Sequence, residues 1–240
     1  MLASSITAPP DWIRHLAGSP PSDEVTRLLH GADDWAISAA AASTLEGLVM
    51  HRRPKSVLEF GAGRSSLVLA LALQQIGGGR LTSIEHQPWH AEAAWRGIGR
   101  YRDVDAQLVV APVKLRITKH GPLYVYDGIR RALAARGPFE LVIIDGPPGR
   151  FGRDWPLFAA APFLSPSGAL IMLDDVERPA EQSALRRWER ALHVERLYES
   201  EGSGRRFAVI QVTAPGRPAF VWRTFLGTCH DRIRSWSASS

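Results

Sequence analysis

The stretch from Ser56 to Ala72 reads SVLEFGAGRSSLVLALA, and the rest of the chain is arranged around it. Its first five residues favour a β-strand, and the run from Ser65 onward, rich in Leu and Ala, favours a helix. Between them, Gly61 and Gly63 permit backbone conformations that side chains disfavour. The stretch therefore predicts a strand, a tight turn and a helix, with a turn on which a ligand can lie directly.

The residues around the two glycines distinguish between two kinds of nucleotide cofactor. A dinucleotide site typically has the pattern G-x-G-x-x-G, but Ser66 stands at the third glycine position. Glu59 precedes Gly61 by two residues, and the segment resembles the acidic-x-Gly-x-Gly motif of class I S-adenosylmethionine (SAM)-dependent methyltransferases. A tight turn without a ligand is the alternative. The resemblance implies that SAM is bound by Glu59, Gly61, Ala62, Gly63, Ser65 and Ser66.

A second acidic residue ends the next predicted strand, which runs from Leu81 to Glu85. In a doubly wound sheet, a carboxylate at this place can accept hydrogen bonds from both ribose hydroxyls of a nucleotide. In the methyltransferases that the chain resembles, the ribose-binding acid falls at this position, which implies that Glu85 and the adjacent His86 bind the cofactor. The alternative is an exposed surface carboxylate.

The second signature is FELVIIDGPPG, from Phe139 to Gly149. Its apolar run predicts a central strand that is buried on both faces and ends at Asp145 and a rigid turn. Ligands of open α/β sheets bind at the carboxyl ends of the strands, so we expect Asp145 to point into the binding crevice. Together with E-F-G-x-G-R-S, this loop resembles a group of bacterial methyltransferase-like proteins related to the plant family that O-methylates glucuronic acid on xylan. That resemblance spans about Ile37 to Val212.

Residues near Asp145 are candidates for contact with a methyl acceptor. Arg150, Arg153 and Trp155 follow it and can grip a carboxylate or a sugar face, although a solvated loop is an equal alternative. The segment 114–126 is expected to be less regular and to line the acceptor pocket, with Tyr126 as a substrate contact. His120, in the same segment, is expected to be solvated rather than catalytic.

A third strand ending, GALIMLDD from Gly168 to Asp175, adds two more carboxylates. Oxygen ligands from Asp145, Asp174 and Asp175 at neighbouring strand ends suit Mg²⁺. The layout resembles that of metal-dependent catechol-type O-methyltransferases, but Asp175 replaces their Asn, and a Pro-Pro loop stands where they carry a catalytic lysine. The favoured alternative is that Asp174 or Asp175 caps the helix that begins near Pro179, with Glu177 in support. Asp145 and Asp174 are the catalytic candidates, and Asp145 is also expected to contact the cofactor.

Composition limits the other function classes. The formal net charge is +5, but only Lys55, Lys114 and Lys119 are lysines, so 26 of the 29 basic residues are arginine, spread along the chain. Without a basic block interleaved with aromatic residues, we expect no nucleic-acid partner, and without a long apolar run we expect no membrane span. Cys229 is the single cysteine, which suits a reducing compartment and a cytoplasmic location.

We therefore expect one α/β domain with a Rossmann-like, doubly wound, seven-stranded methyltransferase sheet, mostly parallel with an antiparallel last strand. The predicted parts are an N-terminal helical extension (1–50), a SAM-binding core (51–214) and a C-terminal helical tail (215–240). We expect the tail to dock on the core, and a homodimer contact through its helix is an alternative. The predicted activity is SAM-dependent O-methylation of a small hydroxylated acceptor with an anionic or sugar-like group. Alternatives are a non-catalytic SAM-binding or scaffolding protein, an aminopropyl transferase and an NAD-dependent oxidoreductase.

Overall fold

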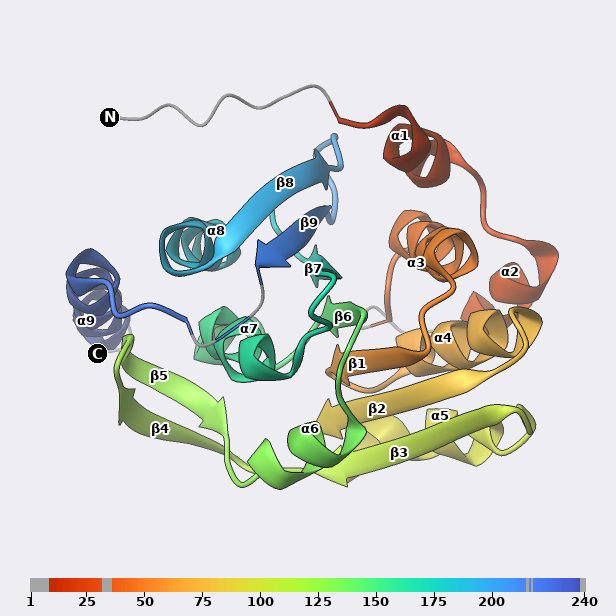
Figure 1. Ribbon diagram of the computed structural model, residues 1–240, viewed down its shortest axis with the longest axis horizontal. Coiled ribbons are helices and arrows are strands. Elements are labelled where there is room, and N and C mark those ends of the chain that lie inside the picture. The colour runs from red at the N-terminus through yellow and green to blue at the C-terminus, as the bar shows by residue number, and fades with distance from the viewer. Residues whose placement is uncertain (1–8, 32–35, 215, 217, 238–240) are drawn as a thin grey trace.

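Seven strands form one sheet with the order β3-β2-β1-β6-β7-β9-β8 (Figure 1). The computed structural model describes residues 9–31, 36–214, 216 and 218–237. Neighbouring strands are parallel except that β9 runs antiparallel to both β7 and β8. The sheet confirms the predicted fold class. Its strands are β1 (Ser56–Phe60), β2 (Gly79–Glu85), β3 (Val104–Val110), β6 (Leu141–Ile144), β7 (Ala169–Asp174), β8 (His193–Glu199) and β9 (Phe207–Ala214).

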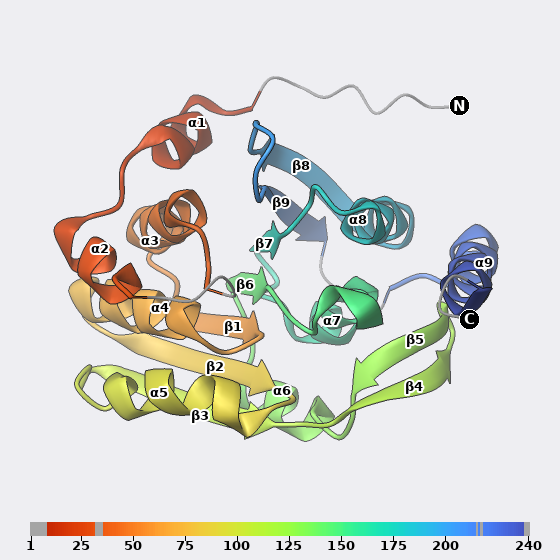
Figure 2. The same cartoon turned by 180° about the vertical axis from the view of Figure 1, so that it is seen from behind.

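Helices cover both faces of the sheet, with α1 to α4 on one side and α7 and α8 on the other (Figures 1 and 2). The central strands β1, β6 and β7 are buried along their whole length, because each face packs into its own apolar cluster. The helices are α1 (Asp11–Gly18), α2 (Asp23–Leu29), α3 (Ala39–Arg52), α4 (Arg64–Gln75), α5 (Pro88–Ile98), α6 (Arg130–Arg136), α7 (Asp154–Ala160) and α8 (Pro179–Ala191). Short 3₁₀ turns, η1 (Gly149–Phe151) and η2 (Ala161–Phe163), flank α7.

The segment 114–126 is regular, which corrects the sequence prediction. Strands β4 (Val113–Thr118) and β5 (Gly121–Tyr126) form an antiparallel hairpin that stands apart from the main sheet. Their alternating Val, Leu, Ile and Tyr residues suit a ribbon with one covered face. Helix α9 (Trp222–Ser237) packs against β5, beside the hairpin in both views (Figures 1 and 2).

The predicted part boundaries at 50/51 and 214/215 stay a prediction. Helix α3 runs from Ala39 to Arg52 and contributes Leu45 and Leu48 to the same apolar cluster as the sheet. Within the described ranges, no helix combines the length and apolarity needed to cross a bilayer.

Candidate active site

The two signature loops touch each other through their glycines. Gly61, which follows β1, has a φ of +93°, and its amide donates to the carbonyl of Ile84 in β2. A Cβ atom on Gly61 would lie 2.8 Å from the amide nitrogen of Gly146, and one on Gly146 would lie 2.8 Å from the Cα of Gly61. Real Cβ atoms do not approach backbone so closely. Glycine at both positions therefore brings the turn after β1 against the loop after β6.

Glu59 lies behind the glycine turn rather than in the cavity. Its carboxylate is fully buried and accepts hydrogen bonds from Ser65 at 2.6 Å, from Ser66 at 2.6 Å and from Ser83. Burial raises the pKa of Glu59 to about 7, against the lowering effect of the three hydroxyls. Because these bonds join β1, β2 and the first turn of α4, Glu59 holds the glycine turn in shape.

Glu85, at the end of β2, also braces this turn but faces the cavity. Its Oε2 atom accepts from the Ala62 amide at 3.1 Å, and its Oε1 atom accepts from the amides of His86 and Gln87 at 2.6 and 2.7 Å. These donors fix the orientation of the carboxylate. The two amides use both lone pairs of Oε1, whereas Oε2 accepts one hydrogen bond and keeps a lone pair for a ligand hydroxyl.

One cavity of about 800 Å³ lies along the carboxyl ends of β2, β1, β6 and β7. Ligands of doubly wound folds bind at this edge, where the strand order reverses. The cavity brings together most of the predicted cofactor residues with Asp145, whereas Glu59, Ser66, Asp174 and Trp155 do not line it. The predicted residues on its wall are Gly61, Ala62, Gly63, Ser65, Glu85, His86, Tyr126, Asp145, Arg150, Arg153 and Asp175.

Asp145 reaches the cavity from the end of β6, with 16% of its side chain exposed. Its Oδ1 atom accepts from the Nη2 atom of Arg153 at 3.0 Å. Burial raises the pKa of Asp145 to about 7, while Arg153 lowers it and the carboxylates of Asp174 and Asp175 raise it. A carboxyl group with this pKa changes protonation state near neutral pH, as a general base must.

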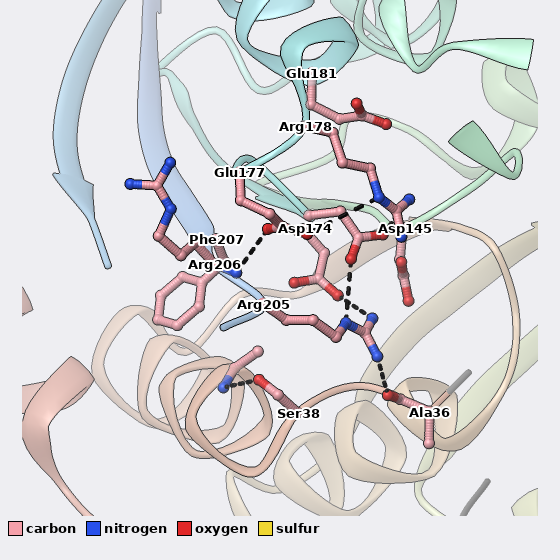
Figure 3. A network of polar contacts seen from close by, with 12 residues as sticks. Ala36, Ser38, Asp145, Asp174, Glu177, Arg178, Glu181, Arg205, Arg206 and Phe207 are labelled. Carbon is pink, nitrogen blue, oxygen red and sulfur yellow. Dashed lines mark hydrogen bonds and ion pairs between the residues drawn. The ribbon is translucent and has the colours of Figure 1, made fainter. Parts of the chain in front are cut away.

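Asp174 and Asp175 form ion pairs and do not cap α8, which corrects the favoured alternative. The residue before α8 is Arg178, and no side chain caps that end. Asp174 Oδ2 accepts from Arg205 Nη2 at 2.9 Å, and Asp175 Oδ1 accepts from Arg205 Nε at 3.1 Å. Glu177, expected to support the helix, instead accepts from the Arg206 amide, as Figure 3 shows.

The substrate candidates separate into cavity residues and structural residues. Arg150 is exposed on the cavity wall, with its guanidinium carbon 4.8 Å from the centre of the Phe151 ring. Arg153 is 3% exposed and already paired with Asp145 and Asp175. Trp155 packs at the edge of the apolar cluster instead. Tyr126 lines the cavity, and its buried hydroxyl has no hydrogen-bond partner among the described residues.

His120, expected to be solvated, is buried. Its ring stacks on Phe158 at 3.9 Å between centroids, and burial lowers its pKa to about 4. It does not line the cavity. The hairpin that carries it folds back against α7, which hides the ring.

The charged residues that the sequence analysis missed include three around the aspartates. Arg205 precedes β9, Arg178 precedes α8, and Glu181 lies in the first turn of α8, fully buried with a pKa that burial raises to about 7. Both arginines line the cavity. One signal for Arg205 was present: an antiparallel strand beside β7 must begin where β7 ends, and the register pairs Phe207 with Asp174.

The predicted metal ligands lie close together but are already paired. One oxygen from each of Asp145, Asp174 and Asp175 can be chosen so that all lie within 4.8 Å of one another. However, Arg153 and Arg205 contact oxygens of all three carboxylates, and Arg178 Nη1 lies 2.8 Å from Asp175 Oδ2. Mg²⁺ requires a nearly regular octahedron of oxygens at about 2.1 Å. The residues as arranged do not fit that ion.

Comparisons with known proteins agree with this geometry. A family model described as a methyltransferase domain matches residues 58–176, just under half of the chain. No curated protein matches significantly.

Solved structures of similar fold include the O-methyltransferase TomG from Streptomyces achromogenes in complex with SAM, at 22% identity and a TM-score of 0.54, covering 88% of this chain and 93% of that one. Cofactor-bound Rv0187 from MTB has 24% identity and a TM-score of 0.56, with 87% and 99% covered. An O-methyltransferase from Bacillus cereus in complex with S-adenosylhomocysteine (SAH) has 19% identity and a TM-score of 0.55, with 80% and 92% covered.

These findings support the methyltransferase interpretation over the other Rossmann-like enzymes. The family match spans the glycine turn, Glu85, Asp145 and the end of β7, which are the elements that form the cavity. Residues 58–176 thus match a methyltransferase domain, and they lie in a seven-stranded sheet whose fold the similar structures share.

Proposed function

We propose that this protein binds SAM in the cavity and transfers its methyl group to a hydroxyl oxygen of a small acceptor with an anionic or sugar-like group. The observation that carries the proposal is that one cavity joins the Gly61 turn, Glu85 and Asp145. Its volume of about 800 Å³ lies in the upper part of the range for small-molecule sites, which leaves room for a cofactor and a small acceptor. The SAM and SAH complexes among the similar structures support the choice of cofactor.

The residues of the cofactor end fit SAM. A Cβ atom on Gly63 would meet no other atom within 4 Å, so the turn is open on the side that a ligand would occupy. Glu85 Oε2 offers an oriented acceptor for a ribose hydroxyl. We assign Glu85, His86 and the turn 61–65 to the cofactor, and Glu59 and Ser66 to holding the turn.

When bound, SAM would supply a methyl group that is attached to a sulfonium sulfur. The acceptor oxygen would take the methyl group, and the sulfur compound would be the leaving group. Asp145 is assigned as the base that takes the proton of the acceptor hydroxyl, because its pKa of about 7 and its place on the cavity wall suit that role. Arg153 holds the Asp145 carboxylate through Oδ1. Asp174 stays off the cavity wall, so its assigned role is to support the network rather than to touch the acceptor.

The acceptor end of the cavity is basic, which supports an anionic group on the acceptor. Arg150 is exposed there, and the side chain of Arg178 is 42% exposed while it contacts Asp175. Arg153 was a substrate candidate, but its ion pairs assign it to positioning Asp145. Trp155 lies off the wall, so we assign the acceptor contacts to Arg150 and Tyr126. No step of the proposal uses Mg²⁺. A cytoplasmic location, the absence of a nucleic-acid partner and a homodimer stay predictions.

A screen of hydroxylated acids and sugars with radiolabelled SAM tests the proposal. We expect methyl incorporation into a small acid or sugar, and label found only in protein or nucleic acid would refute the acceptor class. With a turned-over acceptor, Arg150→Ala should raise KM about tenfold, the effect of one charge-assisted hydrogen bond, and leave the Kd for SAM unchanged. The matched control is Arg186→Ala on the exposed face of α8. An unchanged KM in Arg150→Ala would remove that residue from the acceptor site.

A further inference from the structure

Three guanidinium groups from different parts of the chain surround the carboxylates at the ends of β6 and β7. Arg153 precedes α7, Arg178 precedes α8 and Arg205 precedes β9. Figure 3 shows Arg205 beneath Asp174, with Arg178 on the opposite side of the cluster. Each of the three aspartates therefore contacts at least one arginine, and Arg153 also lies 3.9 Å from Glu181.

The ion pairs occupy most of the oxygens that a metal would need. Asp175 uses both oxygens, because Arg205 Nε lies 3.1 Å from Oδ1 and Arg153 Nη2 lies 2.8 Å from Oδ2. Asp145 Oδ1 is bound by Arg153 at 3.0 Å, and Asp174 Oδ2 by Arg205 at 2.9 Å. A dication at these oxygens would lie beside fixed positive charges in a mostly buried place, where repulsion is weakly screened.

We infer that the guanidiniums of Arg153 and Arg205 take the place of a divalent cation at this site, so that the methyltransferase works without a bound metal. A guanidinium can neutralise and orient carboxylates as a cation does, and its planar donors can bridge two of them at once. Arg205 does this for Asp174 and Asp175, and its Nη1 atom also donates to the Ala36 carbonyl at 2.6 Å. Arg205 is thus a positioning residue whose side chain connects Ala36, on the cavity wall, with the end of β7 and the start of β9.

Removing Arg205 should uncover the metal site that it fills. Asp174 Oδ1 is buried without a hydrogen-bond partner among the described residues. In Arg205→Ala, this oxygen would be joined by Asp174 Oδ2 and Asp175 Oδ1, with one positive charge fewer nearby. Oxygens from two adjacent carboxylates then suit Mg²⁺ or Mn²⁺.

Arg206 provides a matched control next in the chain. Its side chain points away from the cluster in Figure 3, and its Nη1 atom lies 3.4 Å from Glu199. Arg206→Ala therefore removes the same charge and size without uncovering an aspartate of the cluster.

The test is titration of MgCl₂ and MnCl₂ into each purified protein. Calorimetry measures the heat of binding, and thermal unfolding measures the melting temperature (Tm) with and without metal. Wild type and Arg206→Ala should show no heat of binding up to about 5 mM metal. The Tm of each should stay within about 1 °C of its metal-free value. Arg205→Ala should melt lower, bind Mn²⁺ with a submillimolar Kd and recover part of its Tm. If Arg205→Ala does not fold, Arg205→Gln, which keeps length and a donor but no charge, takes its place. Binding by wild type would overturn the inference, and so would a folded Arg205 variant that binds no metal.

The activity arm rests on the proposed function and is judged separately. With an acceptor in hand, wild-type turnover should be unchanged after EDTA treatment, and loss of turnover that Mg²⁺ restores would overturn metal independence. Failure to find any acceptor would count against the proposed function, whereas the binding titrations need neither SAM nor acceptor.

Discussion

The two ends of the cavity are built in different ways. At the cofactor end, the glycine turn, Glu59 and Glu85 come from β1, β2 and α4, and short polar side chains and backbone amides satisfy the acids. At the acceptor end, Arg153 and Arg205 bind Asp145, Asp174 and Asp175 from 8 to 31 residues away in sequence, and Arg178 adds a nearby contact to Asp175. The hydrogen bonds of the first end thus join neighbouring strands within residues 59–87, whereas the ion pairs of the second end join segments spread from 145 to 205.

This difference leads to different sensitivities. The cofactor end depends on the absence of side chains, because Gly61 and Gly146 meet backbone to backbone. The acceptor end depends on long charged side chains whose removal leaves buried charge unpaired. Substitutions that affect one end and spare the other can therefore separate binding of the cofactor from turnover.

The largest effect is expected at the acceptor end, from Asp145→Asn. The substitution keeps the size of the side chain and a partner for Arg153 but removes the base, so kcat should fall about 100- to 10,000-fold. The Kd for SAM should change by less than a factor of three. Steady-state kinetics with the best acceptor from the screen measures the first quantity, and calorimetry measures the second.

A matched control for this substitution is Asp127→Asn, on the hairpin, where Lys114 and Arg116 pair with an exposed carboxylate. Its kcat should equal that of wild type. A kcat for Asp145→Asn that stays within threefold of wild type would assign the proton transfer to another group.

At the cofactor end, Gly61→Ala should destabilise the fold by about 2 to 4 kcal/mol. A positive φ disfavours a side chain, and the new Cβ would lie 2.8 Å from the backbone of Gly146, which cannot move cheaply. Urea unfolding measures the change. Gly63→Ala is the control, because its extended φ of 176° and open surroundings accept a methyl group, so stability should change by less than 1 kcal/mol. Equal losses at both positions would contradict the proposed contact between the two loops.

Much of the cofactor end could be predicted from the sequence because its determinants lie in two consecutive strands and the turn and helix between them. The run from Ser56 to Ala72 indicates strand, turn and helix, and Glu85 ends a recognisable strand. The structure places Gly61, Glu85 and Asp145 on one cavity, as expected. The sequence analysis did not predict that serine hydroxyls donate hydrogen bonds to Glu59 in place of a ligand. One of these residues, Ser83, lies on the neighbouring strand.

The acceptor end was predicted only in part, since its partners meet through topology. An acid before a helix suggests a cap, but Asp174 and Asp175 lie several residues before the start of α8 and pair with Arg205 instead. Arg205 reaches them because β9 runs antiparallel and begins beside the end of β7. The sequence analysis predicted this strand but did not draw that consequence. Likewise, the burial of His120 depends on where the hairpin packs.

The most direct test of the central claim, that this cavity binds SAM through the end of β2, is calorimetric titration of SAM into wild type and Glu85→Ala. Loss of hydrogen bonds to a charged acceptor should weaken binding by about 1.5 to 3 kcal/mol, or about 10- to 150-fold in Kd. Glu92→Ala, on the exposed side of α5, should bind like wild type. Equal SAM affinity in wild type and a folded Glu85→Ala, or no SAM binding by wild type, would contradict the account.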